Sequence, residues 1–516
     1  MGWRETGFHR RRFIVFGYVA EMRIIMAGIG VKLNQIFEKN TLVSALIGFG
    51  YSTVVTVAPM FLVIGAIILM GSVLGLSEMA YAPRELFSCT VLYIFIFSLV
   101  TTAPFNAVLS RYMSDVIYEE RYEDILPCFY LGLFMNIMFS CLLGVPFCIR
   151  EVVVGHLGIL YVFTGFCGYI ALVLVFYAML YLSICKDYKK ISAFFLVGMA
   201  AAFVISLLLV HVFSFPVTDA MLSALAAGFL LIACEEIAIV KRYFKKNSGR
   251  YRPVLAYYKK FWKLVLINTL YIVGLYVHNF VFWTTDLKMI VADSFVCAPS
   301  YDMASCIAMF TNISATVILI SRLEMHFREK YKGYSEAVIG GRGLDIRNAQ
   351  NRMFSSLSSE LMNLARIQFI ISVALFLACV VILPQYGFSG LVMQIYPCLA
   401  VGYFILFLMY SAIIFLYYYN DLSGALWTAV VFFSVTLFGS MIAAQLSVKW
   451  YGIGVVAGSI LGWSVAYFRL RWVERHLDVH IFCSGTLLQS KKGGALPSKV
   501  YDVREQRREE RMGKQR

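Results

Sequence analysis

Residues 367–420, IQFIISVALFLACVVILPQYGFSGLVMQIYPCLAVGYFILFLMYSAIIFLYYYN, contain no Asp, Glu, Lys or Arg over 54 consecutive positions. An α-helix rises about 1.5 Å per residue and the hydrocarbon core of a bilayer is about 30 Å thick, so this stretch can cross a membrane twice. The segment 384–387 supplies a turn between its two halves, with Pro384 and Gly387 as helix breakers. The stretch therefore predicts an integral membrane protein.

The composition of the whole chain agrees with this prediction. Apolar residues make up 60% of the 516 residues and charged residues 15%, which excludes an ordinary water-soluble protein. A net charge of +15 in a soluble protein would suggest nucleic acid, but the basic residues here lie between and beyond the apolar stretches. We expect these residues to face anionic lipid at the cytoplasmic surface, and we expect no nucleic-acid partner.

Apolar stretches of similar length follow one another along the chain. There are eleven such stretches, and residues 367–420 need two helices. The chain is therefore predicted to have twelve transmembrane helices, six on each side of a basic linker at 241–263. The expected fold is an all-α polytopic membrane protein with two six-helix lobes, 42–240 and 264–470. The expected spans are 42–77, 86–110, 125–149, 152–185, 191–218, 220–240, 264–285, 303–321, 367–420, 422–448 and 450–468.

The distribution of Lys and Arg predicts the orientation of these helices, because basic loops stay in the cytoplasm. With the N-terminus inside, the internal loops hold 22 basic residues and the external loops four, namely Arg84, Arg150, Lys288 and Lys449. The chain is therefore expected in the cell (inner or plasma) membrane, with both termini cytoplasmic.

The segments outside the spans carry further expectations. Residues 1–41 are expected in the cytoplasm with an interfacial helix at 29–39, and translation is expected to begin at Met26, with a basic N-terminal tail as the alternative. The loop 324–366 is expected on the cytoplasmic side, where part of it forms an amphipathic surface helix. The tail 471–516 is highly charged and is expected to be disordered beyond about residue 484.

Motifs for catalysis, metals and cofactors are missing from the sequence. There is no Gly-x-x-x-x-Gly-Lys-Ser/Thr phosphate loop, so the chain is not expected to be an ATPase, and no cofactor is expected. His476 and His480 share a helical face but lack a third ligand, so they are interpreted as interfacial rather than metal-binding. Most of the twelve cysteines are interpreted as buried apolar residues, and a Cys297–Cys306 disulfide near the outer face is the minor alternative.

Polar residues inside the spans are the best site candidates, because burying a charge in lipid costs several kcal/mol. Glu235 and Glu236 either pair with Lys241 and Arg242 at the inner interface or form the acidic wall of a cavity. His278 and Asn279 lie two-thirds of the way along the seventh span, where internal hydrogen bonding and substrate contact are equally compatible with the sequence.

Charged residues at the ends of spans are the second group of candidates. Arg111 and Asp115 lie on one face at the inner end of the second span, where an ion pair is the favoured interpretation. Asp302 opens the eighth span at the outer face, where the helix dipole favours an acid whatever its function.

Several motifs in the chain, taken together, resemble the PelG family of exopolysaccharide exporters, within the multidrug/oligosaccharidyl-lipid/polysaccharide flippase superfamily. The likeness covers nearly everything from residue 26 to 483. The family pattern has an acidic-basic pair in the seventh helix where this chain has His278-Asn279. The matching residues are Met26-Ala27-Gly28-Ile29-Gly30, Arg111-Tyr112-x-x-Asp115-x-x-Tyr118-x-x-Arg121, Tyr271, Gly274, Phe282-Trp283, Pro299-Ser300-Tyr301-Asp302, Arg322-x-Glu324 and His476-Leu477-Asp478.

The resemblance implies a MATE/flippase-like fold without catalytic activity. It implies passage of Pel, an amino-sugar-rich and partly cationic polysaccharide, across the inner membrane beside a cytosolic Pel glycosyltransferase and small Pel membrane proteins. It also implies rocking of the lobes around a cavity. The cavity-lining residues would be Tyr51, Asn106, His278, Asn279 and Asp302, and the inner gate or docking surface would include Arg111, Asp115, Glu235, Glu236, Arg322 and Glu324.

Other functions remain open on the sequence. A flippase for lipid-linked oligosaccharide would need several Arg or Lys at mid-membrane, which the spans lack, and a small-molecule antiporter of the same fold is a further possibility. A membrane-embedded glycosyltransferase would need carboxylates in a large loop, and 324–366 has few. A scaffold that only anchors the synthase through its basic inner face is the last alternative.

Overall fold

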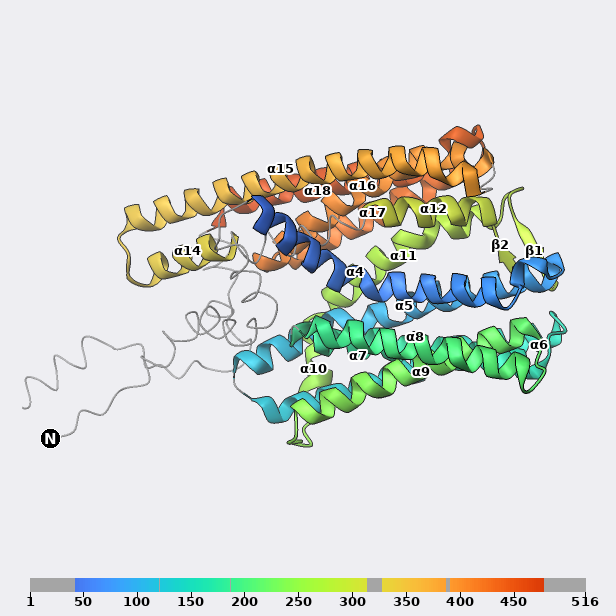
Figure 1. The fold of residues 1–516 in the computed structure, drawn as a ribbon. Helices are drawn as coiled ribbons and strands as arrows, with labels where there is room; N and C mark the ends of the chain where they lie inside the picture. The colour runs from blue at the N-terminus through green and yellow to red at the C-terminus, as the bar shows by residue number, and fades with distance from the viewer. Residues whose placement is uncertain (1–41, 120, 186, 313–326, 387–389, 478–516) are drawn as a thin grey trace, which may run out of the picture.

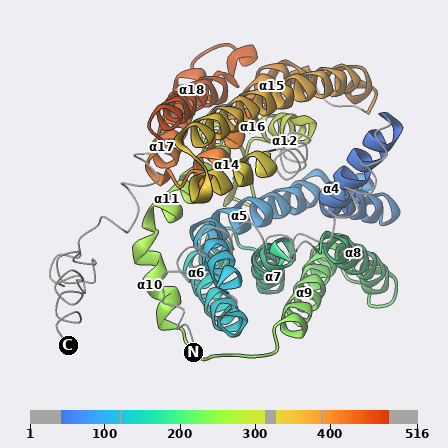
Figure 2. The same ribbon diagram turned by 90° about the vertical axis from the view of Figure 1, so that its left-hand side faces the viewer.

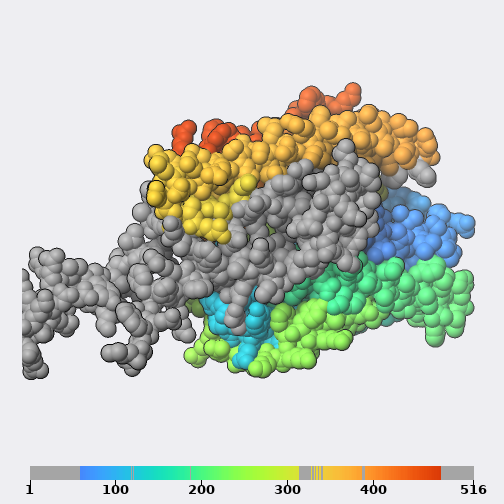
Figure 3. Space-filling model, turned by 60° about the vertical axis from the view of Figure 1, so that its left-hand side comes forward, coloured from blue at the N-terminus to red at the C-terminus, as the bar shows by residue number. Residues whose placement is uncertain are grey.

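The computed structural model describes residues 42–119, 121–185, 187–312, 327–386 and 390–477, with side chains from residue 58 onward. This part of the chain is almost entirely helical. The helices gather into two lobes that lie side by side along their length (Figure 1). In the space-filling view, the blue to green half of the chain forms one lobe and the yellow to red half the other (Figure 3).

The N-terminal lobe is built from six helices around a core cluster that includes Leu109, Phe129, Tyr177 and Phe229. Short 3-10 turns at Leu76–Glu78 and Tyr122–Asp124 lead into α5 and α6. The helices are α4 (Leu42–Val73), α5 (Tyr81–Tyr118), α6 (Ile125–Val153), α7 (Ile159–Ile184), α8 (Tyr188–His211) and α9 (Val217–Tyr243).

The C-terminal lobe has its own core cluster, which includes Tyr301, Tyr396, Phe415 and Phe432. The short helix α10 (Arg252–Lys260) lies in the linker between the lobes, and a hairpin of β1 (Met289–Val291) and β2 (Phe295–Cys297) follows α11. The other helices are α11 (Trp262–Phe282), α12 (Pro299–Asn312), α14 (Arg328–Gly340), α15 (Gly343–Ile382), α16 (Gly390–Tyr418), α17 (Leu422–Ala443) and α18 (Ile453–Arg475), with 3-10 turns at Leu383–Tyr386 and Val448–Trp450.

The prediction of an all-α polytopic membrane fold is confirmed. Ten helices of the described part are long and apolar enough to cross a bilayer. The two other expected spans begin at α4, whose described apolar stretch is shorter, and at α12, beyond which residues 313–326 lie outside the description. The expected helices therefore follow one another in the predicted order, while the total of twelve stays a prediction.

The segment 324–366, predicted as a loop with one surface helix, is different in the structure. Helix α14 occupies its first part, and α15 then runs from Gly343 without a break into the expected ninth span (Figure 1). The Asp345 side chain accepts a hydrogen bond from the Arg342 backbone at 3.0 Å, which caps the helix start. Met353, Phe354 and Leu357 then bury one face against the C-terminal core, so charges on the other face do not interrupt the helix.

Helix α5 lies between the two lobes and contributes to both cores (Figure 2). Ile96 and Val108 belong to the cluster of the C-terminal lobe, whereas Leu109 and Met113 belong to that of the N-terminal lobe. The amide of Asn268 on α11 donates a hydrogen bond of 2.6 Å to the Ala103 carbonyl of α5. We call this contact between α5 and α11 the seam.

Close backbone contact holds α17 against α18. A methyl group added at Gly454 would lie 2.4 Å from the backbone nitrogen of Ser440, and one at Gly458 would lie 3.0 Å from the backbone nitrogen of Thr436. Small residues allow such an approach between membrane helices, where packing rather than the hydrophobic effect drives association.

We predict that Gly454→Ala lowers the unfolding temperature of the detergent-purified protein, because the backbone of α17 must move away, at a cost of about 1–3 kcal/mol. Gly65→Ala on α4 is the matched control, because a methyl group there meets nothing within 4 Å. Equal unfolding temperatures for the two variants would contradict the close packing of α17 on α18.

Candidate functional site

The β1–β2 hairpin connects two helices of the C-terminal lobe yet packs against the N-terminal lobe. Its strands pair antiparallel, and Ala292 and Asp293 form the turn with φ values of 50° and 55°. The hairpin is held by a small hydrophobic cluster, distinct from both lobe cores, that contains Cys89, Val291, Phe295 and Cys297. We call residues 289–297, together with Cys89, Tyr93 and Glu151, the hairpin latch.

Tyr93 on α5 makes the most extensive contacts in the latch. Its hydroxyl donates to the Val296 carbonyl at 2.7 Å and accepts from the Val296 amide at 3.2 Å. Its ring stacks on Trp283, with centroids 5.1 Å apart and an interplanar angle of 6°. One side chain of the N-terminal lobe therefore binds both the edge of β2 and the residue that follows α11.

Glu151 at the end of α6 makes a second link to the hairpin. The Ser294 hydroxyl donates to its carboxylate, and the Arg150 guanidinium donates to Oε1 at 3.0 Å. Glu151 is 1% exposed, so these bonds offset part of the cost of burying its charge. The sequence analysis assigned Arg150 to an external loop and did not identify Glu151 as a site residue.

Asp302, a predicted lining residue, is buried, and its carboxylate is held by hydrogen bonds from three neighbouring residues. Its carboxylate accepts from Trp283 Nε1 at 3.0 Å, from Asn279 Nδ2 at 2.7 Å and from the Ala298 amide at 3.0 Å. These donors fix the indole of Trp283 in the position where Tyr93 stacks on it. Asp302 and Asn279 thus support the latch from the C-terminal lobe.

His278 points into the C-terminal lobe. Its ring nitrogens lie 2.9 Å from the Tyr301 hydroxyl and 3.3 Å from the Tyr403 hydroxyl, and Tyr403 also bonds Ser305 at 2.9 Å. The side chain is 1% exposed. Of the two interpretations of His278, this arrangement corresponds to internal hydrogen bonding, and a substrate contact would require these bonds to break.

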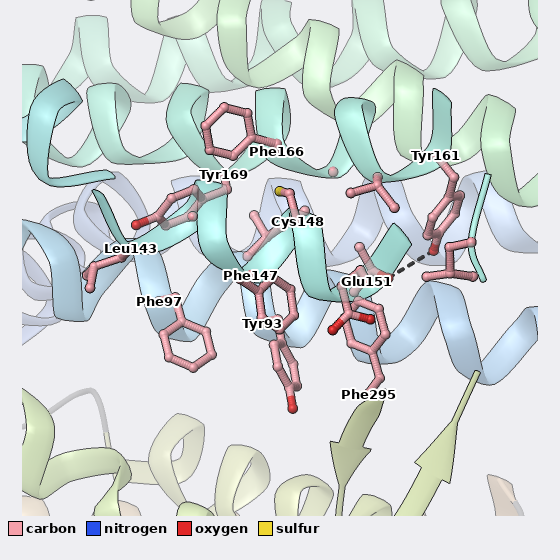
Figure 4. Close-up of a pocket in the computed structure, with 16 residues that line it drawn as sticks. Tyr93, Phe97, Leu143, Phe147, Cys148, Glu151, Tyr161, Phe166, Tyr169 and Phe295 are labelled. Carbon is pink, nitrogen blue, oxygen red and sulfur yellow. Dashed lines mark hydrogen bonds between the residues drawn. The ribbon is translucent and has the colours of Figure 1, made fainter. Parts of the chain in front are cut away.

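A cavity of about 240 Å³ lies in the N-terminal lobe beside the latch (Figure 4). Helices α5, α6 and α7 form its walls, and Phe295 of the hairpin reaches into it from the strand (Figure 4). Its lining is mainly aromatic and aliphatic, and includes Tyr93, Phe147, Phe166 and Tyr169. None of the four predicted lining residues whose side chains are described, Asn106, His278, Asn279 and Asp302, borders it. The cavity and the latch share Tyr93, Glu151 and Phe295, so movement of the hairpin changes the cavity wall.

The predicted gate residues Arg111 and Asp115 contact the linker helix α10. Asp115 accepts a hydrogen bond from the Tyr257 hydroxyl, and the Arg111 guanidinium carbon lies 4.6 Å from the centroid of the Phe261 ring. The structure thus directs both side chains toward the linker between the lobes. The favoured interpretation from sequence had paired them with each other.

The predicted gate residues Glu235 and Glu236 lie near the inner end of α9, and their expected ion pairs can be compared with the structure. Glu236 is fully buried in α9, and neither carboxylate oxygen has a hydrogen-bond partner in the described part of the chain. The ammonium of Lys241 lies over the Tyr130 ring, 5.7 Å from its centroid. Pairing of Glu236 with the basic end of α9 is therefore not observed, and a gate role for Glu235 and Glu236 stays a prediction.

Four further predicted residues can be placed only in part. Asn106 is half-buried on α5, and its Oδ1 has no partner among the described residues. Tyr51 lies on α4, where only the backbone is described, while Arg322 and Glu324 lie outside the described residues. The lining and gate roles assigned to these four remain predictions.

Sequence reasoning also missed a buried amide cluster between α12 and α15. Asn312 and Gln368 are both fully buried. The Ser372 hydroxyl donates to Asn312 Oδ1 at 2.6 Å, and Asn312 donates to the Ala400 carbonyl of α16 at 3.3 Å. An uncharged amide inside an apolar stretch was the available signal, because such groups need a partner in lipid.

Comparison with known proteins identifies the family. A family model described as "PelG: Putative exopolysaccharide Exporter (EPS-E)" matches residues 26–482. The chain belongs to the PelG family. The resemblance inferred from the sequence motifs is thereby confirmed. The search of curated proteins found no match.

Solved structures similar to this PelG-family chain include MATE transporters. MATE in the bent conformation has a TM-score of 0.56 at 13% identity, covering 83% of this chain and 95% of that one. An inward-facing MATE-family transporter of the MOP superfamily gives 0.54 at 13% identity, with coverage of 83% and 95%. An outward-facing one gives 0.52 at 14% identity, with coverage of 83% and 96%. The likeness is therefore one of fold.

We predict that Tyr93→Phe loosens the hairpin latch, because the Val296 amide and carbonyl lose their partner while the ring stacking remains. A lost partner costs about 1–3 kcal/mol, so hydrogen exchange at the Val296 amide should accelerate by about 5- to 150-fold. Tyr81→Phe is the control, because Tyr81 is exposed and its hydroxyl bonds the Met289 sulfur of β1 rather than the backbone of Val296. Unchanged exchange in Tyr93→Phe would show that Tyr93 does not hold the hairpin.

Proposed function

We propose that this protein translocates the Pel exopolysaccharide across the inner membrane by relative movement of its two lobes. Membership of an exopolysaccharide exporter family and the MATE-like fold support polysaccharide transport in general. The observation that carries the proposed movement of the lobes is the hairpin latch, since contacts of one small hairpin with the opposite lobe close the hairpin end of the seam.

The packing of α5 supports a movement of the lobes as bodies. Each lobe has a separate core, and between them α5 contributes aliphatic side chains to both. Contacts along the seam are mostly apolar, with Asn268 as a polar one, so little directional bonding has to break when the seam opens. The latch, in contrast, is held by several hydrogen bonds and must be released for a path to open at that end.

The position of charges supports a neutral or cationic cargo. In the described spans other than α15, Arg and Lys lie within about two turns of the helix ends, as Arg111 does on α5 and Arg469 on α18. On α15, Arg366 comes directly before the uncharged stretch that begins at residue 367. A pyrophosphate-linked sugar would need such residues at mid-membrane. The buried acid Glu236, whose carboxylate oxygens have no hydrogen-bond partner among the described residues, suits a polymer with free amino groups better than an anionic one.

The linker end of the molecule fits a partner at the cytoplasmic face. Basic residues concentrate at 241–263, and α14 and the start of α15 lie at the same end as α10 (Figure 1). We propose that this end, with Arg111 and Asp115 behind α10, docks the cytosolic glycosyltransferase and small Pel membrane proteins and also contacts anionic lipid. Both termini would then be cytoplasmic and the hairpin end would lie outside.

The direct test is export in cells that keep the glycosyltransferase but lack this protein. We expect extracellular polymer to disappear and to return when the chain is restored. Continued export without the protein would overturn the proposal. Transfer of sugar from a nucleotide donor by the purified protein would instead favour the glycosyltransferase alternative.

Opening of the seam gives a second prediction. In a variant with the native cysteines replaced by Ser, Ile96→Cys should react with a membrane-impermeant maleimide from outside only while polymer is being exported, because Ile96 is buried against the C-terminal core. Leu172→Cys is the control of similar burial inside the N-terminal core and should stay unlabelled. Export without any labelling of Ile96→Cys would contradict opening at the hairpin end.

The orientation gives a third prediction. Asp293→Cys in the exposed hairpin turn should be labelled in intact cells, whereas Lys245→Cys in the exposed linker should be labelled only after the membrane is permeabilised. The opposite pattern would place the linker outside the cell and remove the proposed docking surface.

A further inference from the structure

Two cysteine side chains meet where the hairpin latch crosses from one lobe to the other. Cys89 lies on α5 and Cys297 ends β2, 208 residues apart in sequence, and their sulfur atoms are 2.7 Å apart. Packed heavy atoms without a bond usually lie about 3.5–4.0 Å apart, and a disulfide bond is about 2.05 Å long. The thiols are thus much nearer to bonding distance than ordinary packing requires.

The surrounding structure holds the two sulfurs together without a covalent bond. Cys89 and Tyr93 are one helical turn apart on α5, so they share a face. Tyr93 bonds both backbone groups of Val296, the residue before Cys297. Val296 and Cys297 of β2 therefore contact Tyr93 and Cys89, which lie on successive turns of α5. The pairing of Cys297 with Met289 in the hairpin fixes the position of the strand end.

The two thiols face each other at this site, and the carboxylates of Glu85 and Asp302 are near enough to interact electrostatically with Cys89. Cys89 is 3% exposed and Cys297 is 2% exposed, and apolar residues of the latch cluster surround them. Among the described residues there is no group of three side chains able to hold a metal ion. The remaining reaction for two adjacent thiols is their oxidation to a disulfide, which is stable in the oxidising compartments outside the cytoplasm.

We propose that Cys89 and Cys297 are a modification site, at which a disulfide bond between the lobes locks the hairpin latch shut. The oxidant is a disulfide compound outside the cytoplasm. One thiolate attacks it and releases a thiol; the second thiolate then attacks the mixed disulfide and releases another. The protein loses two electrons and two protons, and the oxidant is reduced to two thiols.

Burial determines when this exchange takes place. In the closed latch neither sulfur is accessible, so the first attack occurs while the hairpin is open, and closure brings the second thiol into position. Once formed, the bond is shielded from reductants. The location outside the cytoplasm and the effect on transport rest on the proposed function, whereas the pairing of the two sulfurs rests on the geometry alone.

The pairing is tested on the purified full-length protein incubated with oxidised glutathione, followed by alkylation of free thiols, proteolysis and mass spectrometry. We expect most molecules to yield a peptide linking Cys89 to Cys297. Cys306→Ser is the matched control, because it removes a cysteine of α12 and should keep the link, while Cys297→Ser and Cys89→Ala should each abolish it. Recovery of Cys89 and Cys297 alkylated, or a link between Cys297 and Cys306, would overturn the proposal.

The lock is tested by export from intact cells before and after oxidation. We expect polymer export to fall at least fivefold in cells with the native chain and to recover after treatment with a reductant. In cells with Cys297→Ser, polymer export after oxidation should equal the export of the same cells before oxidation. If the disulfide forms and export does not fall, the disulfide does not lock the latch and export does not require the latch to open. If the disulfide does not form, the modification site is refuted and the transport proposal is unaffected.

Discussion

The arrangement of the whole molecule depends on how helix α5 packs. In lipid every backbone hydrogen bond must be satisfied within the chain, which makes helices the obligatory units, but it does not decide how one bundle sits beside another. Here α5 sets much of that relation, because its two faces belong to two different cores. A change in its tilt or rotation therefore alters both lobes at once.

The polar groups near the hairpin end are arranged to bind one another. Asp302 is surrounded by donors from Asn279, Trp283 and Ala298, and Glu151 is bonded to Ser294. These bonds resist movement of the hairpin, because each bond that is lost leaves a buried donor or acceptor without a partner. The closed hairpin end is thus stabilised by specific bonds, whereas the seam relies mainly on apolar contact.

Much of this fold was predictable from the sequence, because uncharged stretches, turn residues and the bias of Lys and Arg report directly on a bilayer. The order of the helices and the linker followed from these signals alone. The continuous helix over 343–366 did not follow from them, because the charged residues of this segment are typical of a loop. The helical signal was the apolar residue at every third or fourth position. The latch was beyond sequence reasoning: its strands have three residues each, and its contacts join positions more than 140 residues apart. Glu151 and Cys89 gave no local signal, because their meaning comes from the residues across the seam.

Helix α15 is 40 residues long and so measures about 60 Å, roughly twice the thickness of the hydrocarbon core. The first half of the helix packs against the C-terminal lobe, and it continues without a break into the apolar half. Because α15 is one continuous helix, a displacement of its first half would move the apolar half with it, among lipid tails that no soluble protein can reach.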